Sequence, residues 1–166
     1  MIAQRYKNLK TKATYDIWID SDVGNVIFNG SYKDKTGKYG PKQNYCYLGI
    51  DDENQRGSKR IVAVQVGTIE VNPQRQGLGS LMLFHVLNYA SGRDAINEMH
   101  ICDGEPGQKS WQKVFNEGIR LPNLPSDTSD LDDYRANAGP IYTKLKQSAF
   151  SRGWDIIRPE SINLLG

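Results

Sequence analysis

The chain has 166 residues, 38% of them hydrophobic and 24% charged, which is ordinary for one globular domain with its own core. A net charge of +2 is too small to require a nucleic-acid partner. No apolar run is long enough to span a membrane, so a membrane protein is not expected.

The cysteine content favours a reduced compartment. Only Cys46 and Cys102 are present, and two distant cysteines do not form a disulfide framework. The first residues also lack the apolar core of a signal peptide. We therefore expect a cytoplasmic protein that forms a single domain over residues 1–166, with a short tail at 159–166.

The first half of the chain predicts mainly strands. Residues 1–13 carry cations with few apolar anchors, so we expect an arm or a short helix there. Alternating and β-branched residues then predict four strands, separated by glycine-containing turns, over residues 14–20, 26–32, 45–50 and 60–71.

The segment from Gly77 to Ala90 is the strongest helix prediction. Apolar residues cover most of its circumference, and only Ser80, His85 and Asn88 form a polar stripe, so the helix should be largely buried. Residues 99–102 follow as a short strand. A helical crossover joins this strand to the strand over 60–71, so the two should be parallel.

The last third alternates helices and loops. We predict a helix over residues 107–116, a loop over 121–133, a helix from Pro140 to about Arg152, and a final strand over 154–157. This order of elements predicts an α/β domain with a mixed sheet.

The junction between the strand at 60–71 and the buried helix points to a function. Gly77 and Gly79 lie where a strand turns into a helix, and main-chain N–H groups at such a point can bind phosphate. A Rossmann fingerprint would need glycine where Met82 stands, and the P-loop lysine is absent. A plain turn with glycine for geometry alone is the alternative.

The run Gln74-Arg75-Gln76-Gly77-Leu78-Gly79, preceded by Val71 and Pro73, resembles the signature loop of the GNAT superfamily of acyl-CoA-dependent N-acetyltransferases. It is two residues shorter than usual, which is similar to the loop of a small phage anti-CRISPR acetyltransferase. The resemblance implies a GNAT-like α/β fold: a mixed, mostly antiparallel sheet with splayed parallel central strands and flanking helices.

The same resemblance implies that acetyl-CoA is the co-substrate. Amides of residues 75–80 would hold its pyrophosphate, and the end of the preceding strand would hold the pantetheine, with Gly67 suited to a bulge. A glycine that lets a helix pack closely is the alternative at position 67. The backbone around Val71 would hold the carbonyl oxygen of the acetyl group. The expected cofactor-binding residues are Ile69, Val71, Gln74, Arg75, Gln76, Gly77, Leu78, Gly79 and Ser80.

The candidate general base is Glu70. In several family members a glutamate draws the amine proton from a position that is Gln65 here, and glutamine cannot act as a base. Glu70 is the nearest carboxylate to the expected thioester, and it should face away from position 65. Asp103 and Glu105 are rivals, and a surface or salt-bridged role for Glu70 is the alternative.

The candidate general acid is Tyr142. The residues from Ala138 to Tyr142 look like the family's Ala-x-x-Leu-Tyr pattern, in which the tyrosine protonates the leaving thiolate. An ordinary half-buried tyrosine is the alternative.

No metal site is expected. His100 and Cys102 share a strand face, but two ligands do not complete a zinc site. The aspartates of the loop over 121–133 lack EF-hand spacing and could instead line an acceptor site for a cationic substrate; they are Asp127, Asp130, Asp132 and Asp133.

These features together predict an N-acetyltransferase that transfers an acetyl group from acetyl-CoA to an amine. Only residues 22–25 separate the first two strands, where the family places two helices, and the resulting open cleft would suit a protein lysine. Two alternatives stay open. One is a catalytically degenerate domain that blocks a partner protein, and the other is acyl transfer to a nucleobase.

Overall fold

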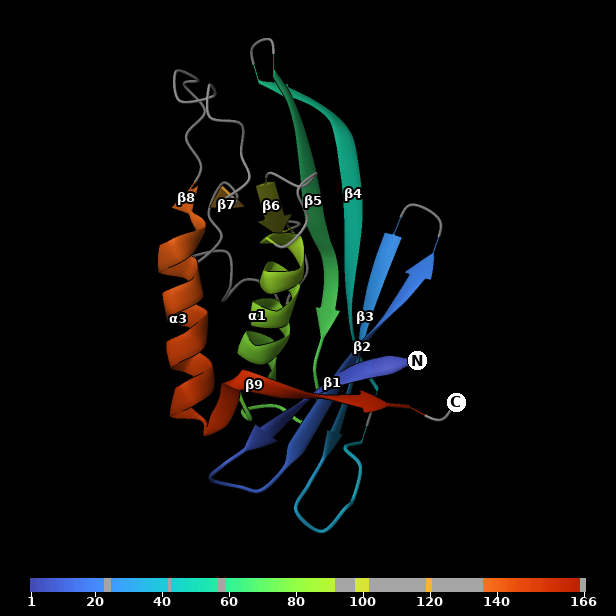
Figure 1. Ribbon diagram of the computed structural model, residues 1–166, viewed down its shortest axis with the longest axis vertical. Helices are drawn as coiled ribbons and strands as arrows, with labels where there is room; N and C mark the ends of the chain where they lie inside the picture. Colours follow the sequence, from blue (N-terminus) through green and yellow to red (C-terminus); the bar gives the residue numbers. More distant parts are fainter. Residues whose placement is uncertain are drawn as a thin grey trace.

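The computed structural model describes residues 1–22, 25–41, 43–56, 59–91, 98–101, 119–120 and 136–164. Its main element is a nine-stranded sheet with the strand order β8-β7-β6-β5-β4-β3-β2-β1-β9 (Figure 1). The strands are β1 (Ile2–Asn8), β2 (Thr14–Asp22), β3 (Asn25–Lys33), β4 (Asn44–Arg56), β5 (Lys59–Glu70), β6 (Glu98–Ile101), β7 (Ile119–Arg120), β8 (Ala136–Asn137) and β9 (Trp154–Asn163). The described helices are α1 (Leu78–Ser91) and α3 (Ala138–Ser151).

The prediction of a GNAT-like α/β fold with splayed parallel central strands is wrong. Strands β1 to β5 form a continuous antiparallel meander, and six of the eight strand pairings are antiparallel. The connections within the meander are short, and a short connection can only reverse the chain direction. The described part of the chain adds only α1 and α3 to this sheet.

Several individual elements agree with their predictions. Strands β2, β3 and β5, helix α1, and the run of α3 toward Arg152 lie within two residues of the expected bounds. Strand β6 is parallel to β5, as expected for a helical crossover, and pairs with it from Ala63 to Val66. The helix predicted over 107–116 and the loop over 121–133 lie outside the described residues.

The ends of the chain differ from the prediction. Residues 2–8, expected as an arm or a short helix, form β1, which pairs with β2 on one side and with β9 on the other. Strand β9 continues to Asn163, into the expected tail. Strand β1 has apolar anchors, because Ala3 and Tyr6 are buried on it despite the cation Arg5 between them.

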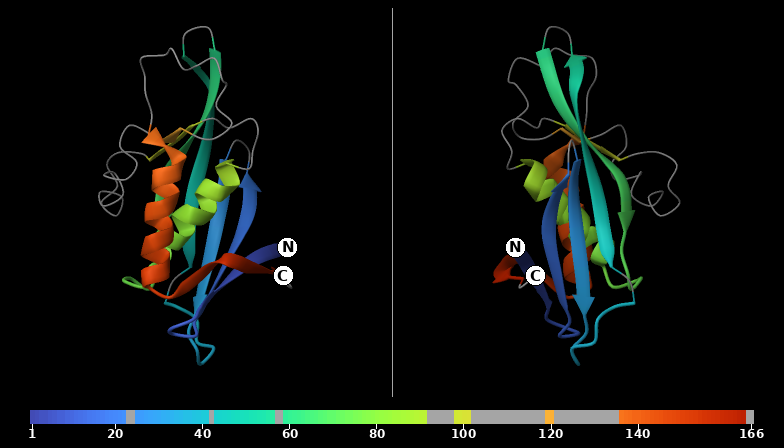
Figure 2. Two further views of the ribbon diagram at one scale, coloured as in Figure 1. Left: turned by 60° about the vertical axis from the view of Figure 1, so that its left-hand side comes forward. Right: turned by 90° about the vertical axis from the view of Figure 1, so that its right-hand side faces the viewer.

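Both helices lie on one face of the sheet (Figure 2). Apolar side chains cover most of the circumference of α1. Leu81, Leu83 and Leu87 are fully buried in the hydrophobic core. The prediction that this helix is largely buried is therefore confirmed. At about 25 cal/mol per Å² of apolar surface, burial of such a helix is a major part of the driving force for folding.

A bulge in β5 changes which face its last residues occupy. Tyr47 pairs with Thr68, but the next residue, Leu48, pairs with Val66, so Gly67 is the extra residue, as its sequence position suggested. Position 65 pairs with Gly49 and Glu70 pairs with Tyr45. The bulge cancels the alternation, so positions 65 and 70 fall on the same face, and the expected opposite orientation is wrong.

One polar pair lies between α1 and the sheet. The Tyr6 hydroxyl and His85 Nδ1 are 2.7 Å apart and share a hydrogen bond, and the His85 ring meets Phe28 edge-on. Burial lowers the pKa of His85 to about 4, because the charged imidazolium would lose its hydration.

We predict that folding stability falls as the pH decreases from 6.5 to 4. The unfolded chain protonates His85 from about its ordinary pKa of 6.5, whereas the folded protein resists protonation until about 4. The difference between these two pKa values corresponds to about 3 kcal/mol of unfolding free energy, which is lost as the pH falls from 6.5 to 4. Urea unfolding at several pH values measures it. The variant His85→Gln, which keeps a hydrogen-bond acceptor, should show a shallower slope between pH 6.5 and 4, and an unchanged slope would contradict the assignment.

Candidate functional site

The turn between β5 and α1 is held in place by a buried amide. Asn44 on β4 is fully buried, and its Oδ1 accepts the main-chain N–H of Asn72 at 2.8 Å. Its Nδ2 donates to the carbonyl oxygen of Asn72 at 3.0 Å and to the Tyr15 hydroxyl at 2.7 Å. The turn therefore leaves the sheet at a fixed point, directly before the cis Asn72–Pro73 bond.

The residues after α3 pack against the other side of this turn. The Trp154 indole N–H donates to the Gln76 carbonyl oxygen at 2.6 Å. Gly77 has a φ of +77°, and a Cβ at this position would lie 2.9 Å from Arg152 Cγ. Because Trp154 takes the Gln76 carbonyl, the first turn of α1 loses one acceptor that Ser80 N–H would otherwise use.

The N-terminal amides of α1 form the candidate binding site. The main-chain N–H groups of Gly77, Leu78, Gly79 and Ser80 donate to no acceptor among the described residues, and the first bond of the helix runs from Leu81 N–H to the Gly77 carbonyl at 3.1 Å. Leu78 and Ser80 are buried, whereas Gly77 and Gly79 are partly exposed. The donors that a ligand can reach are therefore those of the two glycines, at the positive end of the helix dipole.

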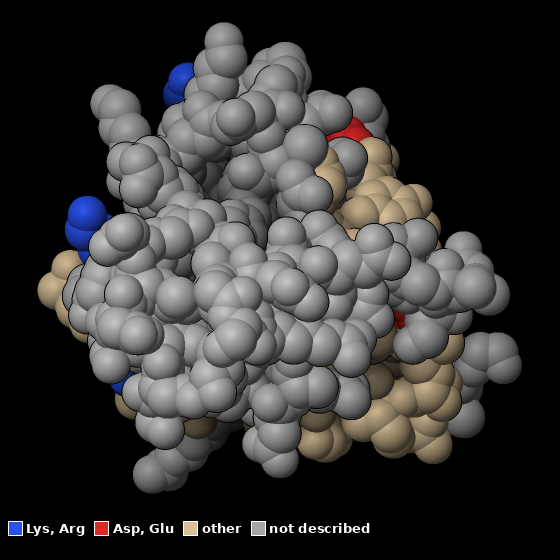
Figure 3. Space-filling view, turned by 90° about the horizontal axis from the view of Figure 1, so that it is seen from above, with Lys and Arg blue, Asp and Glu red and all other residues tan. Residues whose placement is uncertain are grey.

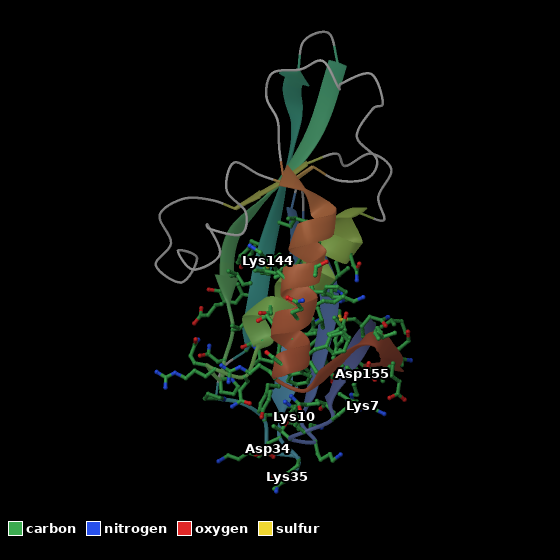
Figure 4. All side chains as sticks on the ribbon, turned by 90° about the vertical axis from the view of Figure 1, so that its left-hand side faces the viewer. Lys7, Lys10, Asp34, Lys35, Lys144 and Asp155 are labelled. Carbon is green, nitrogen blue, oxygen red and sulfur yellow. The ribbon has the colours of Figure 1, made fainter. Side chains whose placement is uncertain are left out.

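Two cationic residues flank these amides. Arg75 is exposed in the turn itself with a φ of +64°, and the exposed Arg152 lays its stem over Gly77. Figure 4 shows Lys10 and Lys35 at the same lower end of the molecule and Lys144 higher on α3. Seen from above, at the opposite end, the described surface carries only isolated charged side chains (Figure 3).

The structure brings most of the predicted cofactor residues to this turn, but several are used by the protein itself. Ile69 and Val71 pack against the core, and the Val71 carbonyl accepts Gln74 Nε2 at 2.7 Å. The Ser80 hydroxyl lies 2.6 Å from the Ser148 hydroxyl, which joins α1 to α3. Of the remaining residues, Gln74 and Arg75 are exposed, and Gln76, Gly77 and Gly79 are partly exposed.

The predicted catalytic residues lie on different elements. Glu70 is the partly buried last residue of β5, and it makes no ion pair with any described residue. Tyr142 lies on α3, and its side chain is outside the described part of the structure. The rival bases Asp103 and Glu105, together with Cys102, are outside the described residues as well.

The ranges that the structure describes contain no group of three or more side chains able to hold a metal ion. Cys46, one of the two cysteines, is a free and buried thiol. No helix in the described ranges is long and apolar enough to cross a membrane.

Sequence reasoning missed three residues that shape the turn: Asn44, Arg152 and Trp154. Each lies far from the turn along the chain, so no local motif connects them to it. A weak signal existed for Asn44, because a polar residue at an inward-facing strand position needs a buried partner.

No family model matches the chain, and no curated protein matches its sequence.

We predict that Gly77→Ala destabilises the fold more than Gly37→Ala does. Both glycines have a positive φ, and that backbone cost is about 1 kcal/mol for alanine. A Cβ at Gly37 meets nothing within 4 Å, whereas a Cβ at Gly77 presses on Arg152. Overpacking adds roughly 1–3 kcal/mol at position 77. Urea unfolding of both variants measures the difference, and equal losses would show that Arg152 yields freely. Substitution of Gly77 is therefore not a clean test of ligand binding.

Proposed function

We propose that the protein binds acetyl-CoA through the turn between β5 and α1 and transfers the acetyl group to an amine. The observation that carries this proposal is the set of main-chain amides at the start of α1 that have no acceptor among the described residues. A helix N-terminus can bind an anion such as a diphosphate on many scaffolds, so the proposal does not require the GNAT fold.

The surroundings of the amides supply the charge that a diphosphate requires. Arg75 and Arg152 are exposed beside Gly77, and charge-assisted hydrogen bonds to phosphate are roughly twice as strong as neutral ones. A plain helix start would be satisfied by water alone. Two arginines at one helix N-terminus favour an anionic ligand over water.

The direction of the strands suggests where the acyl group would lie. From the amides, β5 runs back toward the bulge at Gly67, and the described β5–β6 ladder ends at Val66. A pantetheine arm following β5 would bring the thioester to this region. Tyr142 precedes Ser148, the partner of Ser80, by six residues, so it lies about 9 Å farther along α3 from the amides.

In the proposed reaction, the neutral amine attacks the thioester carbonyl, and a C–N bond forms. The tetrahedral intermediate collapses with cleavage of the C–S bond, and the amine proton passes to the Glu70 carboxylate. The Tyr142 hydroxyl donates a proton to the leaving thiolate. Water can return the proton of Glu70 to the phenolate, so that both groups are ready for the next turnover.

We predict that acetyl-CoA binds with a measurable heat in calorimetry and that acetyl-pantetheine, which lacks the diphosphate, binds far more weakly. Arg152→Gln keeps the stem over Gly77 but removes the charge, and Arg75→Ala removes the other cation. Each should weaken acetyl-CoA binding roughly threefold to tenfold. Lys144→Ala, an exposed cation higher on α3, is the matched control and should bind as the parent does.

The outcomes separate binding from catalysis. Absence of heat at millimolar acetyl-CoA would overturn the proposal. If both arginine variants bound acetyl-CoA as tightly as the parent protein, the diphosphate would not lie at this turn. Release of free thiol in the presence of a lysine peptide measures transfer. Tyr142→Phe should lower kcat without changing the Kd for acetyl-CoA. Binding without any thiol release would favour the catalytically degenerate alternative.

A further inference from the structure

The sheet has a second face that no described helix covers. Helices α1 and α3 lie on one side, and the right-hand view of Figure 2 looks onto the opposite side of strands β2 to β5. Apolar and aromatic side chains on an uncovered sheet face mark an interaction surface when they form a contiguous group.

Strand register brings such a group together. Trp18, Asn29, Tyr45 and Glu70 are successive cross-strand partners on β2, β3, β4 and β5, so their side chains form one row across the sheet. Two residues farther along, Asp20 and Tyr47 lie on the same face in the neighbouring row. We call these six residues the open face.

The aromatic side chains of the open face lie in contact with each other. The Tyr45 and Tyr47 rings meet edge-on with centroids 5.3 Å apart, and 42% of Tyr47 is exposed. Trp18 is partly exposed on β2. Exposed aromatic faces attract cations through the ring quadrupole.

The charges on the open face are not balanced within the described part of the protein. Asn29 Nδ2 donates to Asp20 Oδ2 at 2.7 Å, which orients the carboxylate but leaves its charge. Neither Asp20 nor Glu70 makes an ion pair with a described residue.

Three cations on this side of the sheet, all with described side chains, are already engaged. Arg5 makes a bidentate pair with Asp16 at 2.8 and 2.9 Å, and Lys7 contacts Glu160 at 3.2 Å. Lys33 Nζ lies 4.7 Å from the centre of the Tyr39 ring. The carboxylates and aromatic rings of the open face therefore present a site of the kind that a cation fits.

We propose that the open face binds a cationic, lysine-bearing segment of a partner protein, with a lysine ammonium between Asp20 and the tyrosine pair. The proposed acyl transfer would make this segment the acceptor, and only that assignment rests on the proposed function. Glu70, at the end of the same row, directly precedes Val71 and the turn. A segment lying along the row would therefore reach the edge at which the acyl group is expected.

A second copy of this chain is a poorer occupant. A two-fold interface would place the same surface on both sides, so the carboxylates of Asp20 and Glu70 would be joined by those of the second copy and by no cation of the open face. Burial of carboxylates without a cation to pair them is unfavourable.

The test uses the full chain and a synthetic lysine–glycine repeat peptide, with its fully acetylated form as the neutral probe. Fluorescence anisotropy should show binding of the lysine peptide and loss of binding on acetylation. Asp20→Asn keeps the hydrogen bond to Asn29 within reach, and Tyr47→Ala removes the exposed ring. Each should weaken binding roughly twofold to fivefold, and Asp155→Asn, on the edge strand β9, should leave it unchanged.

Three results would overturn the inference: no binding of the lysine peptide, binding of the acetylated peptide with the same affinity, or Asp20→Asn and Tyr47→Ala variants that both bind the lysine peptide as tightly as the parent protein does. A concentration-dependent dimer that Tyr47→Ala dissociates would instead assign the open face to a second copy, and it too would overturn the inference. Light scattering at several protein concentrations measures whether such a dimer forms.

Failure of this inference is distinguishable from failure of the proposed function. Peptide binding is measured without acetyl-CoA, and acetyl-CoA binding is measured without peptide. Peptide binding with no acetyl-CoA heat would keep the open face and remove the acyl transfer. When both ligands bind, Tyr47→Ala should raise KM for the lysine peptide with little change in the affinity for acetyl-CoA.

Discussion

Asn44 makes the interaction on which the turn and the sheet both depend. Its side-chain amide is fully buried and satisfies the N–H and the carbonyl of Asn72 as well as the Tyr15 hydroxyl. Removal of this amide would leave the buried Tyr15 hydroxyl and the partly buried N–H and carbonyl of Asn72 without their partner. A fully buried polar group left in this way costs about 1–3 kcal/mol. A leucine of similar volume could fill the space but could not hold the turn.

The space for this arrangement is provided by Gly30. A Cβ there would lie 2.6 Å from Tyr15 Cζ, so no larger residue fits beside the ring. Burial also raises the pKa of the Tyr15 hydroxyl, so the ring stays uncharged while its oxygen accepts the hydrogen bond from Asn44 Nδ2. The small residue on β3 thus allows β2, β4 and the turn to meet at one point.

Local patterns were sufficient to predict elements whose signal lies within the element. The apolar circumference of residues 77–90 indicated a buried helix, observed as Leu78–Ser91, and the valine- and isoleucine-rich run over residues 60–71 indicated a strand, observed as Lys59–Glu70. The parallel pairing of β5 and β6 followed from the helix between them. The glycine at the bulge was also recognisable, because glycine in a strand interior often marks an extra residue.

The features that the sequence did not predict depend on contacts between residues that are far apart in the chain. The GNAT-like fold class was inferred from one loop, and a loop does not determine how five hairpin-connected strands pair. Strand β1 was missed because its cations face outward, and its partners in β9 lie about 155 residues away. Likewise, the Trp154 indole reaches the Gln76 carbonyl across 78 residues, and no spacing within the turn could indicate it.

The bulge at Gly67 connects the two proposed sites. Without it, alternation would direct Glu70 toward the core and Ile69 toward the open side, because a one-residue slip exchanges the faces of a strand. With it, Ile69 packs on the core while Glu70 joins Trp18 and Tyr45 on the open face. The amides at the start of α1 begin at Gly77, seven residues after Glu70, where Asn44 has fixed the turn. An acyl donor held at the helix and a cationic acceptor held on the open face, as proposed, would therefore approach the end of β5 from opposite sides of one sheet.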